Sequence, residues 1–197
     1  KSSLKDSAKT QFLSTQRLNV YVDFEEYQHN LKNSKESYVL LCMLEVSLRN
    51  SINHCFLENI STDWLENDFL NSNSKNKINE VKQRINKNSN TDIHNKIISE
   101  LSFGFWTALF RKDYAHIMRI KTIKDIFPNL PKASEKFIDR DYMNKKLNHI
   151  RIFRNKVFHY DKIINKKEFE NIYNDIYELL EYFDIELVEF TKKANNG

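Results

Sequence analysis

The stretch SYVLLCMLEVSLRNSINHCF, residues 37–56, decides the fold class of this chain. Its apolar residues recur at steps of three and four, the spacing of one helix face. They are Leu40, Leu41, Leu44, Leu48, Ile52, Cys55 and Phe56. We therefore predict a long helix over about residues 35–59, begun by the polar segment NSKES at 33–37.

The composition around this stretch favours an all-α fold. The 197 residues are 40% hydrophobic and 13% aromatic, which is enough for a core, and include only 2 Gly and 2 Pro. A β-sandwich or barrel needs frequent turns and therefore more of both residues. We expect a single helical domain over 16–191, a frayed segment over 1–15 and a disordered tail over 192–197.

Further helical segments are expected on both sides of the long helix. They are a short helix or bent segment within 16–29, an exposed helix or hairpin within 71–90, a helix from Thr91 to Phe110, a short helix ending at Phe127, a long helix over 133–160 with Phe137 in its apolar stripe, and an amphipathic helix over 166–191. Gly104 inside LSFGFWTALF costs about 1 kcal/mol of helix stability relative to Ala. We expect a kink or a close helix contact at this glycine.

Cysteine usage and hydropathy bear on the compartment. Cys42 and Cys55 would lie about 20 Å apart on one helix, beyond disulfide reach, and two buried free thiols are typical of a reducing compartment. No Cys/His cluster has zinc spacing, and we find no secretory signal or apolar run near 18 residues. We expect a cytoplasmic protein with no membrane span, metal or cofactor.

The net charge of +4 is unevenly distributed. Residues 111–170 contain 16 Lys and Arg against 8 Asp and Glu, whereas residues 171–190 contain 6 acids and no Lys or Arg. Such a basic segment is typical of a protein with a polyanionic partner. The alternative is that these charges belong to ordinary solvated helix faces.

Two short stretches share the pattern Arg-Asn, three residues, His. They are LRNSINHCF (48–56), with Arg49, Asn50 and His54, and FRNKVFHYD (153–161), with Arg154, Asn155 and His159. Histidine titrates near neutral pH and transfers protons, and arginine grips phosphate oxygens through a planar fork. This inventory suits RNA cleavage by the neighbouring 2′-hydroxyl, in which the substrate supplies the nucleophile.

Five segments together carry a family resemblance, and FGFW followed by the Arg-Asn-x-x-x-His element is its most specific part. They are LSTQRLNVY (13–21), LEVSLRNSINHCF (44–56), LSFGFWTALF (101–110), IKDIFPN (123–129) and IRIFRNKVFHYDKI (150–163). In this set and order the chain resembles the Abi-like (abortive-infection) proteins of bacteria, a branch of the HEPN superfamily. The resemblance covers most of the chain beyond residue 12.

The resemblance implies a HEPN-like helical bundle with extra helices that pairs into a homodimer. It also implies a metal-independent endoribonuclease of anti-phage or toxin systems, in which His159 is the general acid/base, Arg154 binds the scissile phosphate and Asn155 orients the pair. The basic residues expected to hold the RNA backbone are Lys145, Lys146, Arg151 and Lys156. Some HEPN toxins have a modified Tyr two residues after the His; Asp161 stands there in this chain, which argues against that regulation.

The earlier copy of the pattern is open to three interpretations. Glu45, Arg49 and Asn50 match the polar stripe of the family's earlier long helix, and either line the same groove as His159 or form a satisfied network inside the bundle. A second independent centre would need a second bundle, for which 197 residues leave no room. We expect His54 to be structural.

Other functions also fit the sequence. One is a non-catalytic RNA-binding module that forms a ribonucleoprotein with a small noncoding RNA, and another is a purely structural interaction domain with little salt-dependent binding. The partners expected are RNA, a second copy of the chain, and an antitoxin or RNA regulator. The aromatic residues Phe103, Phe105 and Trp106 are expected in the core rather than on a base-stacking surface.

Overall fold

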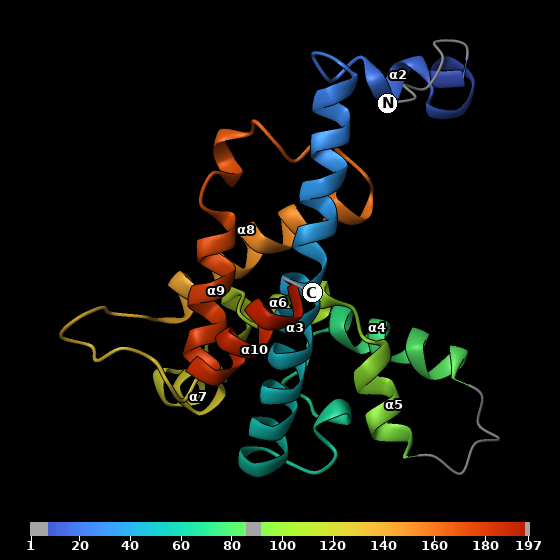
Figure 1. Ribbon diagram of the computed structural model, residues 1–197. Coiled ribbons are helices and arrows are strands. Elements are labelled where there is room, and N and C mark those ends of the chain that lie inside the picture. Colours follow the sequence, from blue (N-terminus) through green and yellow to red (C-terminus); the bar gives the residue numbers. More distant parts are fainter. Residues whose placement is uncertain (1–7, 86–91, 196–197) are drawn as a thin grey trace.

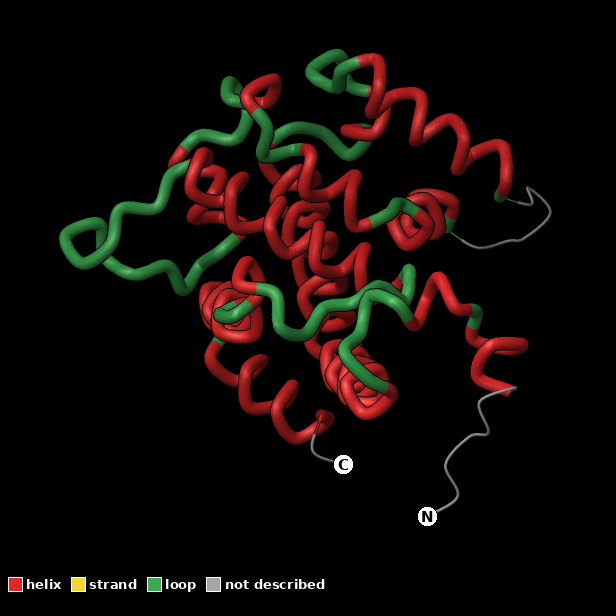
Figure 2. Tube along the Cα trace, turned by 90° about the horizontal axis from the view of Figure 1, so that it is seen from above, coloured by secondary structure: helices red, strands yellow, loops and turns green. Residues whose placement is uncertain are grey.

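The computed structural model describes residues 8–85 and 92–195, and all the regular structure in these residues is helical (Figures 1 and 2). The predicted all-α class is therefore confirmed. Helix also covers part of the two segments predicted to lack it, because a π-helical turn spans Lys9–Leu13 and the last helix continues to Asn195. Residues 1–7 and 196–197 of those segments lie outside the described residues.

The connections between the helices range from one residue, Asp184, to the 13 residues of 127–139. The α-helices are α2 (Thr15–Leu18), α3 (Phe24–Asn59), α4 (Ser72–Arg84), α5 (Ile93–Glu100), α6 (Phe103–Ala108), α7 (Ile120–Ile126), α8 (Arg140–Phe158), α9 (Ile172–Phe183) and α10 (Ile185–Asn195), and the 3₁₀ helices are η2 (Trp64–Glu66), η3 (Lys112–Tyr114) and η4 (Lys167–Phe169). α3 runs through the centre, with α6 to α10 packed around it (Figure 1). Among the described residues no helix is long and apolar enough to cross a membrane.

α3 begins earlier than predicted. Its N-cap is Asp23, whose carboxylate accepts a hydrogen bond from the backbone N–H of Glu26 at 2.7 Å. The segment 33–37 therefore lies inside the helix and does not begin it. Its serine hydroxyls are satisfied by the preceding turn, as when Ser37 Oγ donates to the carbonyl of Asn33 at 2.7 Å.

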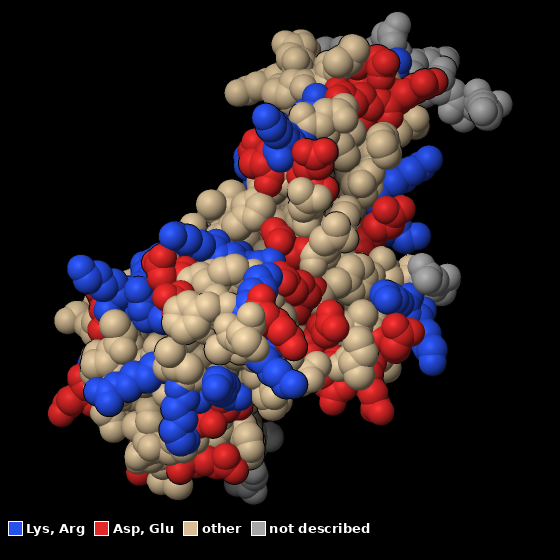
Figure 3. Space-filling model, turned by 90° about the vertical axis from the view of Figure 1, so that its left-hand side faces the viewer, with Lys and Arg blue, Asp and Glu red and all other residues tan. Residues whose placement is uncertain are grey.

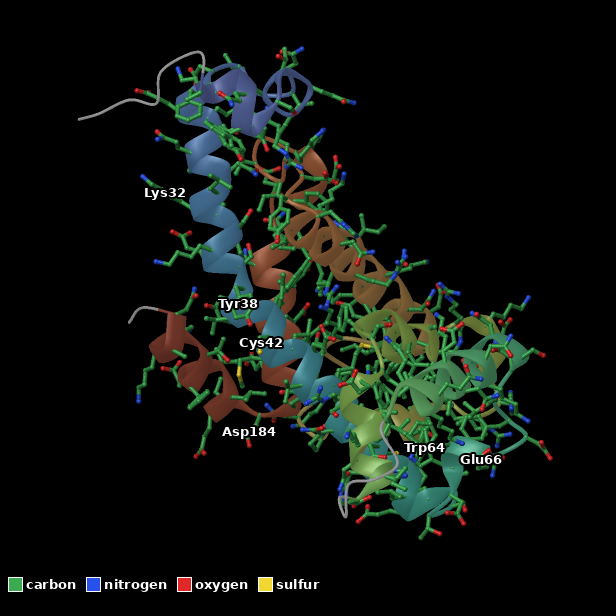
Figure 4. All side chains as sticks on the ribbon, turned by 90° about the vertical axis from the view of Figure 1, so that its right-hand side faces the viewer. Lys32, Tyr38, Cys42, Trp64, Glu66 and Asp184 are labelled. Atoms are coloured by element: carbon green, nitrogen blue, oxygen red, sulfur yellow. The ribbon has the colours of Figure 1, made fainter. Side chains whose placement is uncertain are left out.

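The core surrounds the C-terminal half of α3. Every member of the apolar face predicted over 40–56 is buried, which confirms the helix that the spacing indicates. The three aromatic residues of α6 that were expected in the core are buried there as well. Burial raises the pKa of the Cys55 thiol to about 11. Cys42 is exposed, which corrects the prediction of two buried thiols (Figure 4).

The second long helix is shorter than predicted. α8 starts at Arg140, where the Asp139 carboxylate accepts from the backbone N–H of Tyr142 at 2.8 Å and caps the helix. Residues 127–139 instead form a loop that projects from the body (Figure 1). Phe137, predicted to lie in the apolar stripe, is 62% exposed on this loop.

Two other predicted helices are each divided in two. The segment ending at Phe110 breaks at Leu101 and Ser102, where the backbone is extended, into α5 and α6; its predicted cap, Thr91, lies outside the described residues. The break does not occur at Gly104, where an added Cβ would be 3.8 Å from Arg151 Cδ of α8. Gly104 therefore lies where α6 packs on α8 and causes no kink, and a Cβ there would be at ordinary van der Waals distance from its neighbours. The amphipathic segment over 166–191 likewise divides at Asp184 into α9 and α10.

Three predicted segments remain. The short helix predicted to end at Phe127 is α7, whose last residue is Ile126 and whose C-cap is Phe127; the other two match their predictions in part. The exposed helix or hairpin expected within 71–90 is a helix, α4, capped by Asn71, and it buries Ile78 and Val81. The short helix expected within 16–29 is represented by α2 and by the first residues of α3.

Candidate functional site

The end of α8 is a backbone turn that carries His159. The N–H of Asp161 donates to the carbonyl of Lys156 at 2.8 Å, and the N–H of Tyr160 donates to the carbonyl of Val157 at 3.1 Å; this pair of bonds is a Schellman motif. Tyr160 takes its left-handed position, with a φ of 59°, where glycine is the usual residue. His159 is the C-cap residue, so its imidazole lies exposed at the end of the helix.

The chain after this turn is held by Asn30 of α3, a buried residue with 1% exposure. Its Nδ2 donates to the carbonyl of Asp161 at 3.1 Å, and its Oδ1 accepts from the N–H groups of Ile163 at 2.8 Å and Ile164 at 3.3 Å. One side chain thus satisfies three backbone groups of the loop. The position of the loop after His159 therefore depends on α3.

A second contact from α3 holds the same loop. The Glu26 carboxylate accepts from Lys162 Nζ at 2.8 Å and from Asn165 Nδ2 at 2.6 Å. The hydrogen bonds from Lys162, the backbone N–H of Val22 and Asn165 lower the pKa of Glu26 to about 2. Glu26 therefore stays ionised at neutral pH and keeps its hold on the loop.

Arg154 lies on the flank of α8 that faces α3. Its Nη2 is 3.4 Å from Glu45 Oε2, and its guanidinium carbon is 4.3 Å from the centroid of the Phe158 ring. A charge-assisted pair of this kind is typically about 2.7–2.9 Å long, so the contact with Glu45 is loose. The Nε of Arg154 is buried without a hydrogen-bond partner among the described residues. The guanidinium is thus oriented by Phe158 and Glu45 with hydrogen-bonding capacity to spare.

The earlier copy of the pattern is split between different contacts. Glu45 joins the C-terminal copy through Arg154. Arg49 turns to α5, where its Nη1 donates to the carbonyl of Ser99 at 3.3 Å, and its Nε is buried without a partner in the described part of the chain. His54 is exposed and lies 3.3 Å from Glu58, one turn further along α3.

The contacts support the interpretation in which Glu45 lines the same surface as the C-terminal copy. They give no sign of a second centre made of Arg49 and His54, because each side chain contacts a different residue. Asn50 is exposed and Asn155 half-buried, and neither side chain has a hydrogen bond within the described residues. No side-chain hydrogen bond joins Arg154, Asn155 and His159 to one another there; the backbone N–H of His159 donates to the carbonyl of Asn155 at 2.9 Å as part of the helix end.

The four basic residues predicted to hold RNA differ in availability. Lys146 is only 11% exposed and lies between Asp175, at 2.6 Å, and Glu178 of α9. Burial acts to raise the pKa of Glu178, but hydrogen bonds from Lys136, Lys146 and Tyr182 outweigh it and lower the pKa to about 2. Lys146 is therefore engaged inside the protein.

The other three basic residues remain closer to solvent. Lys145 is 77% exposed and pairs with Asp141 at 2.8 Å along the same helix. Arg151 is half-buried and donates to Asn148 Oδ1 at 2.8 Å. Lys156 is half-buried and has no ion pair among the described residues. On the face seen in Figure 3, basic side chains gather on the lower body with acidic side chains interspersed.

Sequence reasoning missed two residues that shape this surface. Phe158 stands four residues after Arg154, a spacing at which helix side chains meet, so the stacking was accessible from the sequence. Asn30 contacts a loop more than 130 residues away in the chain, and no local signal reveals such a partner. Within the described residues, no group of three or more His, Cys, Asp or Glu side chains is arranged to hold a metal ion.

Comparisons of the chain with protein-family models, with curated proteins and with solved structures found no match. The resemblance to the Abi-like proteins is therefore an expectation from the sequence segments.

Proposed function

We propose that this protein is a HEPN-type, RNA-targeting protein of bacterial anti-phage or toxin systems, and that it is a metal-independent endoribonuclease. The observation that carries the proposal is the placement of Arg154, held between Glu45 and Phe158 on the helix whose end exposes His159. A permanent cation and a titratable imidazole thus share one helix end. The Abi-like resemblance supplies the family and the expectation of a cytoplasmic protein.

The proposed reaction uses the 2′-hydroxyl of the RNA as nucleophile. The 2′ oxygen attacks phosphorus and gives up its proton, the bond from phosphorus to the 5′ oxygen breaks, and the leaving 5′ oxygen takes a proton. His159 moves these protons, and Arg154 exchanges its loose contact with Glu45 for the phosphate oxygens and stabilises their charge. Asn155 orients the two. The products are a 2′,3′-cyclic phosphate and a 5′-hydroxyl.

A homodimer would complete this site. Each chain offers one exposed histidine of the element, whereas the reaction needs both an acceptor and a donor of protons. Exposed rings stand close to Arg154, since Tyr38 is 57% and Phe158 38% exposed with ring centroids 6.1 Å apart. A second copy packing on these rings would bring a second His159 to the site, and sedimentation of the wild type against Tyr38→Ser tests this.

The two copies of the pattern provide a matched pair of variants. We expect His159→Ala to reduce cleavage of cellular RNA by about 100-fold or more, which is the usual contribution of a general acid or base. His54→Ala removes the equivalent histidine of the other copy and should cleave as the wild type does. Cleavage is measured by the yield of 2′,3′-cyclic phosphate ends, and circular dichroism verifies that both variants fold. Equal cleavage by His159→Ala and wild type would refute the proposal that His159 is the general acid/base.

The second candidate is a non-catalytic RNA-binding module that holds a small noncoding RNA. The ion pair of Arg154 with Glu45 and the lack of a contact between Arg154 and His159 in the described residues favour it. It predicts that a discrete, intact RNA co-purifies equally with wild type and His159→Ala. In that case an antitoxin or RNA regulator would control the complex of the protein with its RNA, because there would be no RNA cleavage to control.

A further inference from the structure

A pocket of about 530 Å³ lies beside the turn that carries His159. Its walls come from α2 and the residues after it, from the end of α8, and from the loop that follows. The residues that define its chemistry are Arg17, Tyr21, Lys156, Tyr160, Lys162 and Lys166. The volume falls in the range of about 300–1,000 Å³ that is usual for small-molecule sites.

The pocket is basic, and two of its cations are fixed in place. Arg17 Nη1 donates to the carbonyl of Tyr160 at 2.7 Å, and Lys162 Nζ donates to the carbonyl of Val20 at 3.0 Å and to Glu26. Because these contacts hold the side chains before any ligand arrives, little conformational entropy is lost on binding.

The other two cations are available. Lys156 and Lys166 line the same pocket and have no ion pair among the described residues. One carboxylate, Asp161, also lines it, and Glu26 pairs with Lys162, so four positive charges stand against two negative charges. This balance selects an anion, and lysine and arginine side chains are the usual protein ligands of phosphate.

Two tyrosines add features that a simple ion site would not need. Tyr21 is 8% exposed, and its hydroxyl has no hydrogen-bond partner in the described part of the chain. A buried hydroxyl without a partner is costly, which is explained if a ligand supplies the missing bond. Tyr160 keeps its ring 66% exposed in the same pocket wall, and such a ring is a stacking surface for a base.

From the volume, the charge and the two tyrosines together, we propose that this pocket binds a phosphorylated ribonucleotide, with its phosphate on Lys156, Lys166 and Arg17 and its base on Tyr160. The ligand is either a free nucleotide or the phosphorylated end of an RNA strand. The inference does not depend on RNA cleavage. A ligand here contacts the same turn that carries His159, because Tyr160 is the next residue.

The full chain is titrated with a fluorescent N-methylanthraniloyl derivative of ADP, and binding is followed by polarisation. We expect the double variant Lys156→Gln/Lys166→Gln to bind at least about tenfold more weakly, because two charge-assisted contacts are lost. The matched control is Lys124→Gln/Lys132→Gln, which removes the same charge from exposed residues of α7 and the 127–139 loop, away from the pocket beside α2 (Figure 1), and should bind as the wild type does. Tyr21→Phe should weaken binding while leaving the fold intact.

Competition identifies the source of the ligand. Unlabelled ADP and a short 5′-phosphorylated RNA are compared with inorganic phosphate and the same RNA with a 5′-hydroxyl. Stronger competition by ADP assigns the pocket to free nucleotides, and stronger competition by the phosphorylated RNA assigns it to strand ends. The proposal is overturned if the probe does not bind, if the control variant loses as much affinity as the double variant, or if inorganic phosphate competes as well as ADP.

Discussion

Replacing Asn30 by Ala tests how the loop after His159 is held. The substitution removes the acceptor for the N–H groups of Ile163 and Ile164 and the donor to the carbonyl of Asp161. A buried polar group left without a partner costs about 1–3 kcal/mol. Leaving all three backbone groups without partners would cost more than moving the loop. We therefore expect the loop to shift until water satisfies these groups. We expect a loss of about 2–4 kcal/mol in the free energy of unfolding.

Urea unfolding at neutral pH measures this loss. With a slope near 2–3 kcal/mol per molar urea for a chain of this size, the midpoint should fall by about 1 M. Asn33→Ala is the matched control on the same helix, because within the described residues the Asn33 side chain makes one hydrogen bond, to the carbonyl of His29 at 3.0 Å. It should change stability by no more than about 0.5 kcal/mol. Amide exchange at residues 163 and 164 should accelerate in Asn30→Ala only. A loss below about 0.5 kcal/mol for Asn30→Ala would refute the reasoning, because Asn30 would then not be what holds the loop.

Three further predictions concern stability. Tyr160→Val places a β-branched residue at a φ of 59°, where it is more strained than tyrosine, and should lower the free energy of unfolding measured in urea; Tyr160→Gly removes the cost of about 1–2 kcal/mol that any side chain bears there and should not show this loss. The pKa of Glu178 is lowered from its ordinary value of 4.5 to about 2. Its contribution to the free energy of unfolding is therefore present above pH 4.5 and is lost as the pH falls toward 2. The urea midpoint of Glu178→Gln should lie below that of the wild type at pH 7 and should vary less between about pH 5 and 2.5. Leu48 is 0% exposed in the core, so Leu48→Ala should lower the free energy of unfolding by about 2–5 kcal/mol. A fall of only a degree or two in Tm would contradict the burial of Leu48.

The apolar periodicity of 40–56 was sufficient to place the C-terminal part of α3 and its buried face, because packing follows helix spacing directly. Helix ends were harder to predict. The segment 33–37 has the composition of a cap, but its serines bond back to the preceding turn. Residues 133–139 have apolar members, but Asp139 caps the helix after them. In both cases a single side-chain hydrogen bond decides the boundary, and composition does not reveal which one forms.

The candidate site could be predicted only in part for the same reason. The pattern in 153–161 identified Arg154 and His159, and the contact of Arg154 with Glu45 joins two segments 109 residues apart. Lys146 was indistinguishable in sequence from Lys156, yet it is buried between two acids of α9. Which lysine faces solvent depends on the packing of α9 against α8, and this information is not local.

α3 continues without a break from the bundle to the loop after His159. From Leu40, where the core begins, to Phe24 its axis extends about 24 Å, and this part runs toward α2 (Figure 1). Near Leu40 it still packs on α9 and α8, where Ser37 bonds Tyr173 and Tyr38 lies against Phe158. If the helix moves as a rigid rod, tilting its axis by about 10° about Leu40 moves Phe24 by about 4 Å. Asn30 and Glu26 attach the loop after His159 to this part of α3. A change in packing around the C-terminal half of α3 would therefore move the loop and, with it, His159.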